Sequence, residues 1–253
     1  MPDVLDVPDE ELPPGTDDPD TEMPAQAPAD STGTGADTAA ETAADTAADS
    51  EADTAVATPA RKRPKPGERR VQILQTLASM LEQPGADRIT TAALAARLQV
   101  SEAALYRHFA SKAQMFEGLI EFIESSVFTL VNQITEREGS GAVQAQKMVT
   151  LLLQFGEKNP GMTRVMVGDA LVFEHERLSL RMNQFFDRLE SQLRQSLRAA
   201  AEAAGSPTPT VDAQALASAL TSLAIGRLQR YARSGFKRLP TEHLEPALHR
   251  LTT

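Results

Sequence analysis

The chain of 253 residues carries 25 Lys and Arg against 35 Asp and Glu, a formal charge of −10, and it contains no Cys and no Trp. The lack of cysteine excludes a disulfide framework, a thiolate nucleophile, a cysteine-ligated zinc site and an iron–sulfur cluster. No stretch approaches the roughly 18 apolar residues of a membrane span, and the N-terminus is acidic where a secretory signal would be basic, so we expect a cytoplasmic protein.

Charge is divided unevenly along the chain. Residues 1–60 hold sixteen Asp and Glu, eight prolines, no Lys or Arg and no aromatic residue. Such a segment cannot bury enough apolar surface to offset about 1 to 2 kcal/mol of backbone ordering per residue, which predicts a disordered acidic tail. The sequence RKRPKPG at 61–67 predicts a basic hinge. With 25 bases and 19 acids, residues 61–253 carry a net charge of +6.

Helical periodicity begins at Glu68. Apolar residues at intervals of three and four predict a first amphipathic helix over about 68–83, followed by two short helices over about 91–98 and 101–109. Only Gln99 and Val100 separate the two short helices. That arrangement is typical of a helix-turn-helix, whose second helix enters the DNA major groove. We therefore predict a DNA-binding domain over 68–112.

The polar residues of this region are the candidate DNA contacts. Leu94, Leu98, Leu105 and Phe109 fit an inward face, which leaves the other side of the second helix toward DNA. Lys112 at a helix start opposes the local dipole, so a phosphate contact explains it better than a structural role. The predicted DNA-binding residues are Arg69, Arg70, Thr90, Thr91, Ser101, Glu102, Ala103, Tyr106, Arg107, His108 and Lys112.

Some of these residues also have structural interpretations. Thr90 or Thr91 can cap the first short helix, and Glu102 favours the start of the second. Tyr106 is either a phosphate contact or a half-buried aromatic at a helix junction. A single histidine such as His108 usually has a structural role.

The remaining segments also have a helical period, which predicts an all-α fold. The expected helices span about 111–134, 142–158, a short stretch from Asn159-Pro160, 173–203 and 211–234, with Ser111 and Gln114 forming a cap. We predict that residues 113–253 form a helical dimerisation and partner-binding domain. The apolar stripes of the last two helices, which include Leu220, either form a four-helix interface between two copies or fill the core of one.

Catalytic signals are missing from the sequence. It contains no P-loop, no G-x-S-x-G elbow, no H-E-x-x-H and no glycine-rich dinucleotide turn. His243 and His249 are the two histidines closest in sequence, and we expect them in a frayed C-terminal segment rather than on a metal. We therefore expect no enzyme, no cofactor and no metal site.

The sequence ITTAALAARLQVSEAALYRHFASK at 89–112 and the long helical remainder resemble the TetR-type transcriptional regulators. Two further stretches, LLLQFGEKNPGMTRVM and ALVFEHERLSLRMNQFFDRLESQLRQSLR, resemble the nucleoid occlusion factors within that family. The resemblance covers about residues 69–239. Two positions depart from the family pattern, since Gln99 stands where many members have glycine and Ala110 where many have proline.

The resemblance implies a homodimer bound to palindromic double-stranded DNA on the nucleoid. It further implies that the bound protein inhibits ring assembly by FtsZ, the tubulin-like division protein, whose acidic tail contacts a groove near the fourth and fifth helices. The residues implied as FtsZ contacts are Phe122, Leu151, Lys158 and Asn159. A ligand-responsive TetR-type repressor is the alternative, and an adaptor acting through its acidic tail is another. The tail either competes with DNA phosphate for the basic surface or only adds solubility.

Overall fold

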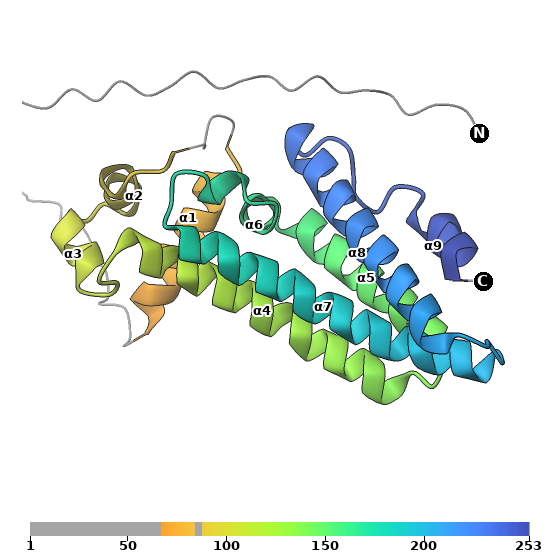
Figure 1. Cartoon of the computed structure of the whole chain (residues 1–253). Helices are drawn as coiled ribbons and strands as arrows, with labels where there is room; N and C mark the ends of the chain where they lie inside the picture. Colours follow the sequence, from red (N-terminus) through yellow and green to blue (C-terminus); the bar gives the residue numbers. More distant parts are fainter. Residues whose placement is uncertain (1–66, 84–87, 253) are drawn as a thin grey trace, which may run out of the picture. The chain divides into compact units, whose positions relative to one another are not determined.

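The computed structural model describes residues 67–83 and 88–252 (Figure 1), so the predicted acidic tail and all of the hinge except Gly67 lie outside it. These described residues form nine α-helices and one short 3-10 helix and contain no strand, which confirms the all-α prediction. Within them, no helix is both long and apolar enough to cross a membrane. The elements are α1 (Glu68–Leu81), α2 (Thr91–Leu98), α3 (Glu102–Tyr106), α4 (Lys112–Arg137), α5 (Gly141–Lys158), α6 (Pro160–Met166), η1 (Asp169–Leu171), α7 (Glu176–Ala203), α8 (Pro209–Arg233) and α9 (Leu244–Thr252).

The helix-turn-helix is fixed by local hydrogen bonds. The Thr90 hydroxyl accepts from the Ala93 amide at 3.2 Å, and the Ser101 hydroxyl accepts from the Ala104 amide at 3.3 Å. Between the two helices Gln99 takes a left-handed conformation with φ 55° and ψ 48°. A non-glycine residue there costs on the order of 1 kcal/mol. The turn has the geometry that usually favours glycine, as the family pattern implied.

The second short helix, α3, is shorter than predicted. The amides of His108 and Phe109 both donate to the Leu105 carbonyl, at 2.9 and 3.1 Å, so the helical hydrogen-bond pattern ends there. Two side chains form hydrogen bonds at the start of α4. The Ser111 hydroxyl caps the first turn of the helix, and the Gln114 side chain accepts from the Ala110 amide at 2.8 Å. The predicted cap is confirmed, although Gln114 reaches Ala110 rather than Ser111.

Glycines allow two close helix contacts in the packed core. A Cβ on Gly141 would lie 2.0 Å from the Ser196 carbonyl oxygen of α7, and one on Gly161 would lie 2.1 Å from the Ala78 carbonyl oxygen of α1. Gly161 therefore lets α6 rest directly on α1, which joins the helix-turn-helix region to the remaining helices. The buried apolar residues form one cluster that extends from Ile73 to Leu248.

The last helix corrects the expectation of a frayed C-terminal segment. Leu244 and Leu248 of α9 are buried, and the Gln146 side chain of α5 donates to the Thr252 hydroxyl at 2.6 Å. His249 lies on this helix. His243 precedes it with φ 52°, and its Nε2 lies 3.7 Å from the Glu242 carboxylate.

The apolar stripes of α7 and α8 mainly fill the core of one chain. The two helices lie side by side (Figure 1). On α7, Leu189 and Leu193 have no exposed surface, and Leu220, Ala224 and Leu228 of α8 are equally buried. These buried stripes are therefore not available to an interface between two copies.

Candidate nucleic-acid interface and helical groove

The predicted DNA contacts on α3 and the following turn lie at the surface. Tyr106 keeps 46% of its surface exposed, and Ser101, Ala103, Arg107 and His108 are also exposed. Within the described part of the chain, neither the Tyr106 side chain nor the Arg107 side chain forms a hydrogen bond or ion pair. Exposed side chains on a short helix and at its two ends, most of them hydrogen-bond donors, suit contact with a phosphate backbone and base edges.

Glu102 and Thr91 form a hydrogen bond with each other, which restricts their availability as DNA contacts. The Thr91 hydroxyl donates to the Glu102 carboxylate at 2.6 Å, joining the first turn of α2 to the first turn of α3. The bond fixes the angle between the two helices. Thr90 is a cap residue, as the sequence allowed.

The two arginines at the start of α1 differ in their contacts. The Arg70 guanidinium donates to the His108 carbonyl oxygen at 2.9 Å and lies 4.1 Å from the centre of the Phe109 ring. It therefore holds the start of α1 against the turn that follows α3. Among the residues that the structure describes, the Arg69 side chain donates only to the uncharged Gln72 side chain, at 2.8 Å.

Lys112 is paired with a carboxylate. Its ammonium group contacts Glu174, whose side chain is 9% exposed, while the Lys112 side chain is 25% exposed. The pair offsets the unfavourable position of a cation at the start of α4. Glu174 and Arg177 are both paired with residues of α4.

A row of ion pairs continues along α4 and α7. Arg177 lies 2.8 Å from Glu117, and Arg181 donates twice to Glu124, at 3.0 and 2.6 Å. The hydrogen bonds to Glu124 raise the pKa of Arg181 above its ordinary value. Together with the pair of Lys112 and Glu174, which precedes α7, these ion pairs connect α4 to α7 and to the segment before it over several turns.

A shallow apolar groove of about 260 Å³ runs between α4 and α5. Leu130 is 41% exposed in it. Phe122, which is 48% exposed, continues this surface toward the other end of α5, where its ring centre lies 6.4 Å from that of Phe155. The groove is lined by Leu130, Gln133, Ile134, Arg137, Glu138, Lys147 and Leu151.

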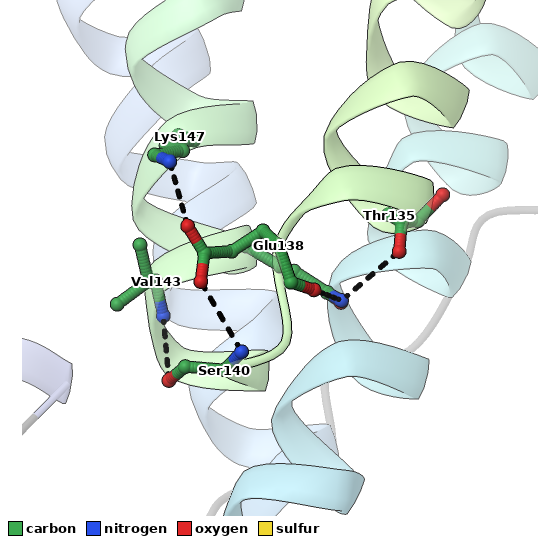
Figure 2. A network of polar contacts seen from close by, with 6 residues as sticks. Thr135, Glu138, Ser140, Val143 and Lys147 are labelled. Carbon is green, nitrogen blue, oxygen red and sulfur yellow. Dashed lines mark hydrogen bonds and ion pairs between the residues drawn. The ribbon is translucent and has the colours of Figure 1, made fainter.

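Glu138, one of the residues that line this groove, is held in a network of hydrogen bonds (Figure 2). Its carboxylate accepts from the Lys147 ammonium at 2.6 Å and from the Ser140 amide at 3.3 Å. These two bonds, the Lys147 bond first, hold the pKa of Glu138 below its ordinary value. The Gln144 side chain donates to the Glu138 carbonyl oxygen at 2.6 Å. The connection between α4 and α5 is thereby fixed.

Phe122 and Leu151, two of the residues implied as FtsZ contacts, lie on this one surface. Lys158 is exposed at the end of α5, and the Asn159 side chain donates to the Phe155 carbonyl oxygen at 2.8 Å, which caps that helix. Sequence reasoning missed several residues that line the groove, namely Leu130, Ile134, Arg137 and Lys147. It also missed Phe155, whose ring packs against that of Phe122.

Two family models match the chain. The model of the bacterial regulatory proteins of the tetR family matches residues 73–119, and that of the tetracyclin repressor-like C-terminal domain matches residues 140–253. The nucleoid occlusion factor SlmA of Idiomarina loihiensis is 53% identical over 175 residues, which cover 69% of this chain and 89% of that protein. SlmA of Photobacterium profundum is 52% identical over 182 residues, which cover 72% of this chain and 92% of that protein.

Solved structures share the fold at low sequence identity. The transcriptional regulator FadR of Bacillus subtilis, solved with stearoyl-CoA, has a TM-score of 0.58 at 11% identity, covering 72% of this chain and 97% of that chain. PfmR of Thermus thermophilus has a TM-score of 0.58 at 19% identity, covering 72% and 95%. Because about half of the aligned residues are identical over most of the length of the two SlmA proteins, the chain belongs to the TetR-type regulators and, within them, to the SlmA family of nucleoid occlusion factors.

Proposed function

We propose that this nucleoid occlusion factor binds palindromic chromosomal sites as a homodimer and, while bound, inhibits FtsZ ring assembly through the groove between α4 and α5. The observation that supports it most directly is the 53% identity to an SlmA protein along nearly nine tenths of that protein. The ligand-responsive repressor has the same fold, but the SlmA relatives favour nucleoid occlusion.

On the DNA side, Tyr106 and Arg107 are proposed to contact phosphates, with Ala103 and Ser101 facing the base edges. The exposure of all four residues supports this assignment. A single recognition helix reads only a few base pairs, so two copies related by a two-fold axis explain a palindromic site.

On the FtsZ side, the chemistry of the groove suits an acidic peptide with apolar side chains. Its floor is apolar at Leu130, Ile134 and Leu151. Arg137 lies at the end nearest the connection to α5, and Lys158 is exposed at the far end of α5. An apolar groove with a cation toward each end attracts an anionic segment and gives its apolar residues a place to bind.

Co-sedimentation with FtsZ polymers, with and without target DNA, tests this function. We expect the protein to bind the polymers and to reduce their mass when target DNA is present. Phe122→Ala should lower FtsZ binding by about tenfold, since an exposed aromatic anchor contributes more than 1 kcal/mol at many interfaces. DNA affinity should stay unchanged. Val172→Ala, at a residue 69% exposed outside the groove, is the matched control.

Two results would contradict the FtsZ assignment. One is equal binding of intact FtsZ and FtsZ without its acidic tail. The other is a Phe122→Ala protein that sediments with the polymers as well as the parent does while both bind DNA normally.

A further inference from the structure

A small pocket of about 160 Å³ lies where α8 ends and the chain turns toward α9 (Figure 1). Three arginines line it. Arg227 and Arg230 come from the last two turns of α8, and Arg238 comes from the connection that follows. None of the residues that line this pocket lines the groove between α4 and α5, and none is a predicted DNA contact. The proposed function therefore does not account for it.

The arginines of this pocket are available to an anion. The side chains of Arg230 and Arg238 are exposed and form no hydrogen bond or ion pair with the residues that the structure describes. Arg227 donates through Nη1 to the carbonyl oxygens of Pro240 and Glu242, at 3.0 and 2.7 Å. A cation in the last turn of a helix is favoured by the helix dipole, which accounts for Arg230. Arg238 lies after the helix, so this explanation does not extend to it.

The connection that carries Arg238 is held in place by local contacts. The Ser234 hydroxyl accepts from the Lys237 and Arg238 amides, at 3.1 and 2.9 Å. The Phe236 ring packs edge-on against Tyr231 with 5.1 Å between the ring centres, and its backbone is left-handed with φ 63°. Such a conformation is rare for an aromatic residue and persists only where the surroundings fix it. A fixed backbone lowers the entropy that Arg238 loses on binding a ligand.

The charge of the pocket indicates the class of ligand. Three guanidinium groups and the Glu242 carboxylate give three positive charges and one negative charge, a net of +2. A phosphate monoester carries about −1.5 to −2 at pH 7 and has three strong acceptor oxygens. Planar guanidinium groups bind such oxygens in pairs. A carboxylate or a phosphodiester of the DNA backbone has a single negative charge and leaves part of this positive charge unbalanced.

The size of the pocket suits one chemical group rather than a whole ligand. Sites for drug-sized molecules usually enclose about 300 to 1,000 Å³. A volume of about 160 Å³ is smaller than that range, so most of a larger molecule has to lie outside the pocket. Leu239, which also lines the pocket, is 48% exposed and offers an apolar contact to an attached organic group.

We propose that this pocket binds the phosphate monoester of an organic molecule. Arg230 and Arg238 donate to the phosphate oxygens, while Arg227 adds positive charge and holds the connection at Pro240 and Glu242. The site is separate from the DNA and FtsZ contacts proposed above and adds a third ligand. A soluble ester such as glycerol 3-phosphate and the lipid phosphatidic acid both carry this group, and the experiment distinguishes them.

Isothermal titration calorimetry of the full chain with glycerol 3-phosphate and with inorganic phosphate, in a phosphate-free buffer, tests the site. We expect one site per protomer for both. Arg238→Gln should weaken binding at least about tenfold, because charge-assisted hydrogen bonds are lost. The bond to Ser234 uses the backbone amide and is retained in this variant. Arg233→Gln, at an exposed position of α8 that does not line the pocket, is the matched control and should bind as the parent does.

A second variant changes the charge of the pocket in the opposite direction. Glu242 is the one carboxylate among the described residues that line it. Glu242→Gln should tighten binding by about threefold, because a negative charge near the phosphate is removed. Arg227 keeps its acceptor, since that bond uses the Glu242 carbonyl oxygen. Tighter binding is a result that damage to the fold cannot produce.

Sedimentation with phosphatidylcholine vesicles, with and without phosphatidic acid, identifies the source of the ester. Binding of glycerol 3-phosphate without retention on either vesicle supports a soluble ligand. Retention that needs phosphatidic acid and is lost in Arg238→Gln supports the same group on a lipid. Retention that is equal for the parent and Arg238→Gln would overturn the assignment of lipid binding to this pocket.

Other results would overturn the site itself. One is a parent chain that binds neither glycerol 3-phosphate nor inorganic phosphate, and another is equal binding of acetate and the ester. Parental affinity in both Arg238→Gln and Glu242→Gln would place the ligand elsewhere. Finally, weaker binding of Arg238→Gln to target DNA with a shallower salt slope would assign this arginine to the DNA backbone.

Discussion

Tyr106 and Arg107 are adjacent exposed side chains that end the recognition segment, and both are proposed to contact phosphate. Tyr106→Phe removes only a hydroxyl and should cost about 1 kcal/mol per protomer on every DNA sequence alike. Arg107→Gln removes a charge and should flatten the slope of log affinity against log salt by about one per protomer.

Titrating both variants with salt on target and random duplexes checks these roles, with Arg250→Gln as the control for a charge remote from DNA. If the Arg107→Gln protein keeps the parental salt slope, Arg107 does not contact phosphate in the parent. A Tyr106→Phe effect confined to the target site would assign the hydroxyl to base recognition.

Lys112 is predicted from sequence to contact phosphate, and the structure pairs its ammonium group with the Glu174 carboxylate. Its pair with Glu174 has to be exchanged if the ammonium group contacts phosphate. Glu174→Gln should therefore free Lys112, strengthen DNA binding and steepen the salt slope by about one per protomer. Folding stability should fall by about 1 kcal/mol because a partly buried cation loses its partner.

Affinity titrations and urea denaturation of the Glu174→Gln protein measure the two effects. Weaker DNA binding at unchanged salt slope would mean that the pair orients the start of α4 rather than restraining Lys112. Glu176→Gln, at an exposed position two residues later, is the matched control.

At the scale of helices, two glycines at the start of α5 have opposite surroundings: Gly139 lies in the connection before the helix, and Gly141 is its first residue. A methyl group on Gly141 would lie 2.0 Å from the Ser196 carbonyl oxygen, whereas nothing lies within 4 Å of one on Gly139. Gly141→Ala should force α5 away from α7 and cost about 1 to 3 kcal/mol. That loss lowers the melting temperature by several degrees in a chain of this size.

Thermal unfolding of Gly141→Ala and Gly139→Ala provides the comparison, since the positions differ by only two residues. Gly139→Ala should be neutral or slightly stabilising because it restricts the unfolded chain. Equal melting temperatures for the two variants would show that α7 can shift to accommodate the methyl group.

The sequence predicted most helices within about three residues of their observed ends, because caps and apolar spacing are local signals. The Ser111 cap and the left-handed Gln99 are examples. It missed α9, whose leucines at 244, 248 and 251 have helical spacing but extend over only nine residues. Such a helix is stabilised by contact with α5, which no local pattern encodes.

The groove was predictable only in part, for a related reason. Phe122 and Leu151 were implied by the resemblance, while Leu130 and Ile134 have the helical spacing of core residues. Which apolar residues remain exposed depends on where α5 and α7 pack against α4. The only sequence signal for such a groove is that a helix contains more apolar residues than it can bury on one face.

For the whole molecule, the burial of Leu220 moves the expected dimer contact to the outward face of α8. That face carries Val211, which is 66% exposed, and the exposed small residues Ala215, Ala219 and Ser222. Ala219→Arg should give folded monomers, because a charge placed there disturbs only a close contact between copies. Leu220→Arg should instead unfold the chain, since it buries an unpaired charge in the core.

Sedimentation and circular dichroism of the two variants separate the possibilities. A folded dimer of Ala219→Arg would exclude this face as the interface. Ala203→Arg, at an exposed residue at the end of α7, controls for the addition of an exposed charge.

One helix, α4, begins directly after the recognition segment and also forms a wall of the groove, and ion pairs connect it to α7. Two ligands that bind one protein obey thermodynamic reciprocity at equilibrium. Whatever factor DNA applies to the affinity for an FtsZ tail, the tail must apply to the affinity for DNA. If DNA promotes FtsZ binding, an assembling division ring would lengthen the residence of this protein on the chromosome. FtsZ polymers and chromosomal DNA would then each raise the affinity of the protein for the other.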